Sequence, residues 1–82
     1  MLFNRASEIV TIKAMAFRND ASAELVTITE MSLDRCRFTS AATFADGERL
    51  RLHIRGQGLI EVRAQFTTDG IVHAAFSIEC RV

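Results

Sequence analysis

The feature that most constrains the fold is an alternation of apolar and polar residues in short segments that end at glycine-containing turns. It is clearest in the second half of the chain, where residues 49–55, 60–66 and 72–79 alternate with a period of two. This period places the apolar side chains of a β-strand on one face and the polar side chains on the other. The connecting segments are Arg55-Gly56-Gln57-Gly58 and Thr68-Asp69-Gly70, and Asp-Gly is a preferred hairpin turn. The second half is therefore predicted to form three strands joined by short turns.

Three further strands are predicted in the first half of the chain. Residues 8–17 and 23–29 alternate, with the turn Arg18-Asn19-Asp20-Ala21-Ser22 between them, and a short strand starts at Cys36. Asn and Asp favour such turns because they tolerate left-handed backbone and bond to their own main chain. Residues 40–45 are small and weakly patterned, which predicts a loop with at most one helical turn, closed by Asp46-Gly47.

Six short strands with regularly spaced turns predict an all-β fold, a small six-stranded antiparallel β-barrel. Closure of the barrel removes the unpaired edges that a small open sheet would expose. The barrel domain is predicted to span residues 8–82, after an N-terminal leader at residues 1–7. Arg49 and Arg51 should face outward. The apolar residues that share the inward parity should form one core: Val26, Ile28, Phe38, Leu50, Leu52, Ile54, Ile60, Val62, Phe66, Val72, Phe76 and Ile78.

Composition narrows the functional classes. The chain has 82 residues, enough for one domain, and 49% of them are hydrophobic, which is typical of a packed interior. Ten basic residues balance ten acidic ones, which argues against general nucleic-acid binding because phosphate contacts need a basic excess. Cys36 and Cys80 form no disulfide framework or Cys-x-x-Cys pair, and no signal peptide or membrane segment is apparent. A cytoplasmic location without membrane contact is expected.

No catalytic or metal-binding constellation is apparent in the sequence. Ser32 and Cys36 have no His at a spacing that indicates an activating base, which nucleophilic catalysis requires. His53 and His73 are both expected to face outward, where they can be neighbours, but they have no third metal ligand. We therefore expect neither an enzyme nor a metal protein.

The corner between the second and third predicted strands carries a motif. It reads Glu30-Met31-Ser32-Leu33-Asp34-Arg35, followed by Cys36-Arg37-Phe38. This resembles the corner of PilZ domains, small bacterial β-barrels that bind cyclic di-GMP, where Asp or Asn is followed by any residue, Ser, two residues and Gly. The Ser is kept, Glu30 is one methylene longer than Asp, and Arg35 stands in place of Gly. Strand order and turn placement extend the resemblance over most of residues 8–82, and it implies a PilZ-like barrel.

The resemblance also implies ligand-binding residues. In PilZ domains an Arg-x-x-x-Arg arm near the N-terminus and the acid and Ser of the corner hold the ligand, because guanidinium groups bind phosphates and a carboxylate accepts from guanine. Arg5 matches one arginine of the arm, and Met1 stands at the other position. Arg35 offers a phosphate contact of its own. The candidate ligand residues are Arg5, Glu30, Ser32 and Arg35. No cofactor is expected, and cyclic di-GMP is a possible but weak ligand.

Three functional hypotheses follow. The leading one is a PilZ-like regulatory module of cyclic di-GMP signalling whose nucleotide site is degenerate, so that protein contacts carry the function. The alternative is a genuine cyclic di-GMP receptor with a variant site. The third is an unrelated barrel that binds RNA or an acidic partner through an arginine-rich face. The simpler interpretation of that face is an ordinary solvated surface whose charge is balanced by glutamates. The arginines in question are Arg49, Arg51, Arg55 and Arg63.

A protein partner or self-association is also expected at one end of the barrel. PilZ domains often carry a helix after the barrel, and this chain ends too soon for one. An apolar opening is therefore expected near Leu2, Phe3, Phe44 and Leu59.

Overall fold

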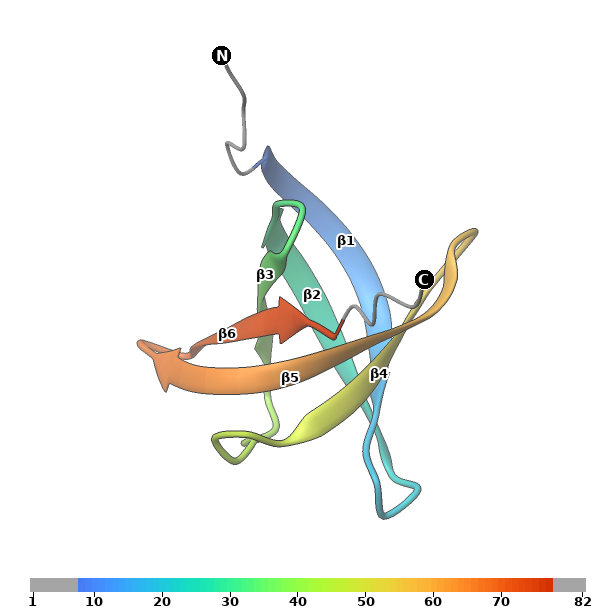
Figure 1. The fold of residues 1–82 in the computed structure, drawn as a ribbon, viewed down its shortest axis with the longest axis vertical. Coiled ribbons are helices and arrows are strands. Elements are labelled where there is room, and N and C mark those ends of the chain that lie inside the picture. Colours follow the sequence, from blue (N-terminus) through green and yellow to red (C-terminus); the bar gives the residue numbers. More distant parts are fainter. Residues whose placement is uncertain (1–7, 78–82) are drawn as a thin grey trace.

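The computed structural model describes residues 8–77, which form six β-strands and, within that range, no helix (Figure 1). The strands are β1 (Glu8–Phe17), β2 (Ala23–Met31), β3 (Arg35–Ser40), β4 (Arg49–Ile54), β5 (Gly58–Thr68) and β6 (Ile71–Phe76). They close into an antiparallel barrel in the order β1-β2-β3-β6-β5-β4. The predicted all-β, six-stranded antiparallel barrel is confirmed. The predicted leader at residues 1–7 lies outside the described residues.

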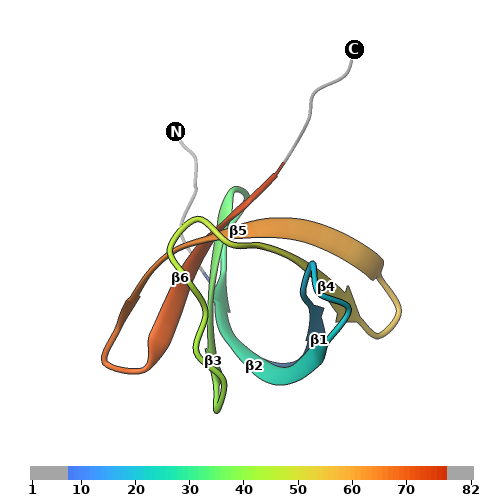
Figure 2. The same cartoon turned by 90° about the horizontal axis from the view of Figure 1, so that it is seen from below.

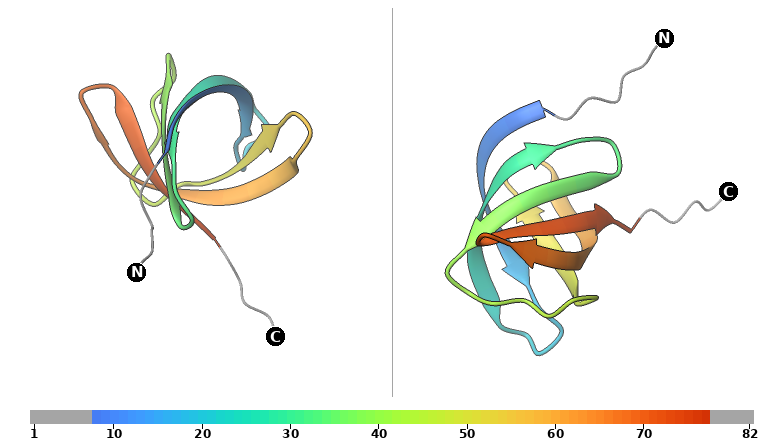
Figure 3. Two further views of the ribbon diagram at one scale, coloured as in Figure 1. Left: turned by 90° about the horizontal axis from the view of Figure 1, so that it is seen from above. Right: turned by 90° about the vertical axis from the view of Figure 1, so that its left-hand side faces the viewer.

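The barrel consists of two sets of consecutive strands. Short turns connect β1 to β2 to β3 and β4 to β5 to β6, and residues 41–48 form the longer connection between the two sets, a loop as predicted. Closure comes from the pairings of β1 with β4 and of β3 with β6. The long strand β5 curves so that its start pairs with β4 and its end with β6, which the views from below and from above show (Figures 2 and 3). No helix in the described part of the chain is long and apolar enough to cross a membrane.

One contiguous core fills the barrel, and most of its members have the predicted parity. Val26, Ile28, Phe38, Leu50, Leu52, Ile54, Val62 and Val72 are buried, whereas Arg49 and Arg51 are exposed, so these predictions are confirmed. Ala14, Ala16, Cys36, Phe44, Ala64 and Ala74 complete the buried set, with Ile60 and Phe76 partly buried against it. Ile78 lies outside the described residues.

The prediction that Phe66 belongs to the core is wrong. Its side chain is 48% exposed. The cause is a break in the alternation of β5, where Ala64 pairs with Ala74 but Phe66 pairs with His73. Two steps along β5 thus face one step along β6, which is the geometry of a β-bulge. Because of this extra residue, Ala64 faces inward and Phe66 faces outward although their parity is the same.

The prediction of an apolar opening at Phe44 is also wrong. Phe44 is only 5% exposed and packs edge-to-face on Phe38, with their ring centroids 5.7 Å apart. Arg18 covers it, since its guanidinium lies 4.6 Å from the ring centroid. The same guanidinium donates to both carboxylate oxygens of Glu48, at 2.7 and 3.0 Å, and this contact lowers the pKa of Glu48. The loop 41–48 therefore closes this end of the barrel. Leu2 and Phe3 lie outside the described residues.

The Asp69-Gly70 turn forms as predicted. Both residues have positive φ, 55° and 78°, which is the conformation that a two-residue type I′ hairpin requires. The turn pairs Thr68 with Ile71 and so sets the register of β5 against β6.

Cys36 behaves as the small buried apolar residue that its strand position indicates. It is a free thiol on the inner face of β3, and burial raises its pKa to about 11. Cys80 lies outside the described residues.

The core predicts a contrast between two chemically identical substitutions. Ile28→Val removes a methylene from a fully buried side chain and should lower the free energy of unfolding by about 1 kcal/mol. Ile9→Val, at a side chain that is 81% exposed, should change it by less than about 0.5 kcal/mol. Urea denaturation measures both values. Equal effects would contradict the described packing.

Cys36 predicts a loss of stability in alkali. Its folded pKa is raised, so the unfolded thiol loses its proton first and stability falls between about pH 9 and pH 11. A shift of two pKa units corresponds to about 2–3 kcal/mol. The chain has no Tyr and Lys13 is its one Lys, so few other groups titrate there. Urea denaturation against pH in a Cys80→Ser background should show this fall, and Cys36→Ala in that background should remove it.

Candidate functional site

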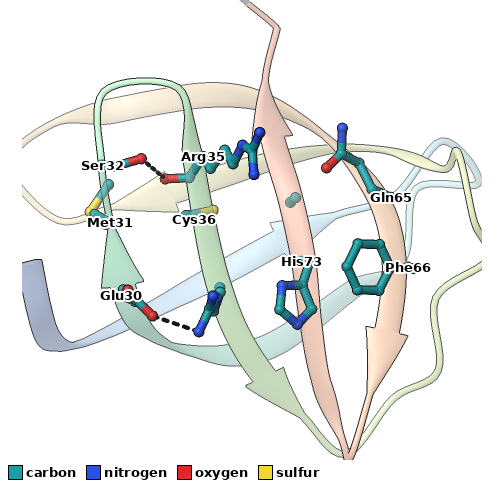
Figure 4. A pocket seen from close by; sticks show the side chains of 10 residues that line it. Glu30, Met31, Ser32, Arg35, Cys36, Gln65, Phe66 and His73 are labelled. Atoms are coloured by element: carbon teal, nitrogen blue, oxygen red, sulfur yellow. Dashed lines mark hydrogen bonds and ion pairs between the residues drawn. The ribbon is translucent and has the colours of Figure 1, made fainter. Parts of the chain in front are cut away.

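A shallow hollow lies in the outer wall of the barrel where β2, β3, β6 and β5 run side by side (Figure 4). Its volume is about 120 Å³, which is below the roughly 300–1,000 Å³ of typical small-molecule pockets. A bound ligand would therefore place only part of itself in the hollow and rest on the surrounding wall. The lining residues are Glu30, Met31, Ser32, Arg35, Cys36, Arg37, Gln65, Phe66, His73 and Ala74.

Three of the four predicted ligand residues meet in this hollow. Glu30, Ser32 and Arg35 all line it, because the corner after β2 folds back directly into β3. Arg5 lies outside the described residues. The structure thus places these three corner residues together, and their role in ligand binding stays a prediction.

Four outward side chains form a continuous row beside the corner, which we call the site row. Glu30 on β2 pairs with Arg37 on β3, Arg37 with His73 on β6, and His73 with Phe66 on β5. Paired residues on one face of a sheet have Cβ atoms about 4.5–5.5 Å apart. A carboxylate, a guanidinium group, an imidazole and a phenyl ring therefore lie side by side across four neighbouring strands.

The side chains at the two ends of the site row, Glu30 and Phe66, face outward because a β-bulge precedes each of them. On β2, Ile28 pairs with Phe38 but Glu30 pairs with Arg37, so the alternation breaks at Thr29. Ile28 is buried, and without this break Glu30 would share its inward direction. The bulge before Phe66 on β5 has the same effect at the other end. β-Bulges commonly redirect a side chain in this way.

The Glu30 carboxylate is already engaged by Arg37. Oε1 of Glu30 lies 2.9 Å from Nη1 of Arg37 (Figure 4, dashed line). The Arg37 side chain is about half exposed, and exposed pairs of this kind contribute about 0–1 kcal/mol. A ligand that needs the Glu30 carboxylate has to compete with this modest ion pair.

Ser32 is used within the corner itself. Its hydroxyl donates to Oδ1 of Asp34 at 3.2 Å, and its N–H donates to the carbonyl oxygen of Arg35 at 2.9 Å. These contacts close the turn between β2 and β3. The Ser32 hydroxyl therefore has a structural role here, and any ligand contact comes in addition to it.

Arg35 fits at the position that is Gly in PilZ domains. Apart from glycines, only Ala21 and Asp69 among the described residues have positive φ, so the backbone of Arg35 is unstrained. Its side chain is exposed and extends from β3 toward β6 (Figure 4). No described carboxylate lies within ion-pair distance of it. Arg35 is thus a cation of the hollow that is available to an anionic ligand.

Phe66 and His73 form a stacked aromatic pair that the sequence did not reveal. Their rings stack with centroids 4.4 Å apart and planes 13° from parallel. Because each ring covers one face of the other, only the outer ring faces remain for a planar group to stack on. The alternation of β5 assigned Phe66 to the core, and no residue pattern marks the bulge that turns it out.

The two histidines are not neighbours, contrary to the possibility raised from the sequence. His53 pairs with Met15 and Leu59, whereas His73 pairs with Arg37 and Phe66, and β5 separates their strands. Within residues 8–77, no group of three or more His, Cys, Asp or Glu side chains is arranged to hold a metal ion.

Comparison with known proteins identifies the fold. No protein-family model and no curated protein matches the sequence. Among solved structures, the chain is similar to the crystal structure of the PilZ domain of CeSA from a cellulose synthesizing bacterium, with a TM-score of 0.75 over 92% of this chain and 83% of that one. This chain has a PilZ-like fold. The two sequences are 12% identical, so the PilZ likeness concerns the path of the backbone and leaves the function to be argued from the residues.

The exposed position of Phe66 predicts a small effect of its removal. Phe66→Ala should lower the free energy of unfolding by about 1 kcal/mol, since it removes one stacked, half-exposed ring. Phe38→Ala, at a fully buried ring, should cost about 3–5 kcal/mol. Urea denaturation measures the free energy of unfolding of both variants. A cost for Phe66→Ala equal to that for Phe38→Ala would mean that Phe66 packs inside.

Proposed function

We propose that this chain is a PilZ-like regulatory module of bacterial cyclic di-GMP signalling whose nucleotide site is degenerate, so that protein contacts carry its function. The observation that carries the proposal is the ion pair between Glu30 and Arg37. It engages one oxygen of the carboxylate that the corner motif would offer to guanine, so a ligand has to displace Arg37 or use the other oxygen.

The cations near the corner support the same proposal. Cyclic di-GMP carries two phosphates, and tight binding of such a ligand needs several converging guanidinium groups. Arg35 is available, but Arg37 is engaged by Glu30. The arm of PilZ domains is represented by Arg5 alone. Each missing charge-assisted hydrogen bond costs the site roughly 1.5–3 kcal/mol of binding free energy.

A regulatory role fits the chemistry of the hollow better than an enzymatic one. The Cys36 thiol is buried and its pKa is raised, whereas reactive cysteines have a lowered pKa and are accessible. The Ser32 hydroxyl donates to Asp34 inside the turn. Neither residue is prepared for nucleophilic attack. We place the module in the bacterial cytoplasm, with a protein as its partner and no cofactor.

A cyclic di-GMP receptor with a variant site is the second candidate. It is favoured by one specific observation, namely that Glu30, Ser32 and Arg35 line the same hollow as the stacked rings of Phe66 and His73. A guanine base on these rings would gain stacking energy, while Arg35 would contact a phosphate. The two candidate functions predict different affinities of the chain for cyclic di-GMP.

Calorimetric titration with cyclic di-GMP separates the two candidates. We expect either no detectable binding or a Kd in the tens of micromolar range or weaker. Such a Kd corresponds to a binding free energy of roughly −6 kcal/mol or one less favourable. A submicromolar Kd that is lost in Ser32→Ala or Arg5→Ala would overturn the proposal in favour of the receptor.

The chain offers a matched control for the Ser32→Ala variant. Ser22 also donates its hydroxyl to an Asp two residues away, Asp20, but in the turn between β1 and β2, away from the hollow. Ser22→Ala should therefore leave any nucleotide affinity unchanged. A loss of affinity in both variants would indicate a general effect on folding.

A further inference from the structure

A second row of outward side chains crosses the barrel wall on β2, β1, β4 and β5. Leu25 pairs with Met15, Met15 with His53, and His53 with Leu59. We call these four residues the apolar row. Leu25 is 63% exposed, Met15 36% and Leu59 58%. Leu25 and Met15 adjoin each other, and His53 stands between them and Leu59. Adjoining exposed apolar side chains are typical of a contact site, whereas isolated ones are not.

The apolar row is separate from the site row. Its members lie on β2, β1, β4 and β5, and none of them lines the hollow at the corner. β1 and β4, which carry its centre, contribute no residue to that hollow. A contact on the apolar row therefore does not require the nucleotide site.

Positive charge surrounds the apolar row on both sides. On one side of the row, Lys13 lies two residues before Met15 on β1, and Arg55 lies two residues after His53, just past the end of β4. At the other side Arg51 pairs with Glu61 next to the row, and Arg49 pairs with Arg63 two residues further away. All of these side chains are exposed. Glu61 is the one carboxylate among these flanking residues, against five cations, although the whole chain has a net charge of zero.

The dimensions of the apolar row suit a helix. Neighbouring strands lie about 4.8 Å apart, so three intervals span roughly 14 Å. An α-helix covers this length in about ten residues at 1.5 Å per residue, and its apolar side chains at i, i+3, i+7 and i+10 lie on one face. Because barrel strands are tilted, a row of paired residues runs partly along the barrel, where a straight helix can follow it.

We propose that the apolar row docks an acidic amphipathic helix of a protein partner. The inference rests on the proposed function, in which protein contacts carry the signal, and it names the surface and the chemistry of the partner. Apolar side chains of the helix pack on Leu25, Met15 and Leu59, and its carboxylates face the flanking Lys and Arg side chains. Laying an amphipathic helix on an apolar strip is a common mode of peptide recognition.

Other occupants fit these features less well. A second copy of the chain would bring two positively charged faces together, which costs energy. RNA is recognised through phosphates and base stacking on aromatic side chains, whereas His53 is the one aromatic side chain of this row. A helix with carboxylates beside an apolar face matches both the shape and the charge.

The test uses a model peptide and the complete chain. The probe is an acidic amphipathic peptide of about 18 residues, held helical by a side-chain staple, with Leu on one face and Glu beside it. Fluorescence anisotropy measures its Kd, and amide chemical shifts in NMR spectra locate its site. We expect shifts at the apolar row and an affinity that falls with added salt, because the flanking charges are exposed.

Two variants and two controls define the result. Met15→Gln and Leu59→Gln should each weaken peptide binding about tenfold or more, because each removes an apolar contact at the centre or end of the row. Leu33→Gln, at an exposed Leu of the β2–β3 corner, should leave the Kd unchanged. A matched peptide with Lys in place of Glu should bind at least tenfold more weakly than the acidic one. Circular dichroism verifies that the variants fold.

Several outcomes would overturn the inference. These are absence of binding, equal binding of the Lys peptide, or shifts located away from the apolar row. The inference would also be overturned if anionic vesicles or single-stranded RNA bound the same residues more tightly than the peptide. Self-association that Leu59→Gln abolishes would overturn it as well, because a second copy of the chain would then occupy the row. The nucleotide titration decides the proposed function independently. If the peptide fails while cyclic di-GMP binds weakly, the regulatory proposal stands and its contact surface lies elsewhere.

Discussion

The closed ring of antiparallel backbone pairings is the constraint on which the rest of this structure depends. The two three-stranded halves have little interior of their own, and they obtain one only when β1 pairs with β4 and β3 pairs with β6. The 41–48 connection makes this possible and also seals an end, through Phe44 beneath Arg18. It is tied to β5 as well, because Gly47 N–H donates to the carbonyl oxygen of Ala64, and Ala64 N–H donates to that of Glu48.

Closure of so small a ring requires sharp bends, and the bends create the site. β5 has to leave β4 and join β6, and it bulges directly after Ala64, where the connection from β3 is bonded to it. β2 bulges at Thr29 just before its corner. Each bulge adds curvature and reverses the direction of the following side chain. Glu30 and Phe66 are the side chains that follow, so the two ends of the site row result from the geometry of closure.

The wall of the barrel carries two different surfaces, which its net charge of zero conceals. The site row combines an ion pair with a stacked aromatic pair around a shallow hollow. The apolar row is flanked by exposed Lys and Arg side chains. Three acids pair with other cations, because Glu30 pairs with Arg37 while Glu24 and Glu48 pair with Arg18. Cations outnumber acids around the apolar row, although the chain is neutral as a whole.

The sequence by itself determined the strands, the turns and the barrel, because alternation with a period of two and the Asp69-Gly70 turn act between residues that are close along the chain. It also placed Glu30, Ser32 and Arg35 at one corner, since six consecutive residues of a tight turn cannot separate. Only the tertiary structure decided that Phe66 faces outward, that Phe44 is buried and that Arg37 engages Glu30. The directions of Phe66 and Glu30 depend on bulges within the β5–β6 and β2–β3 pairs, and the burial of Phe44 depends on its packing against Phe38 and Arg18. A bulge that shifts the register by one residue leaves no local pattern for alternation to reveal.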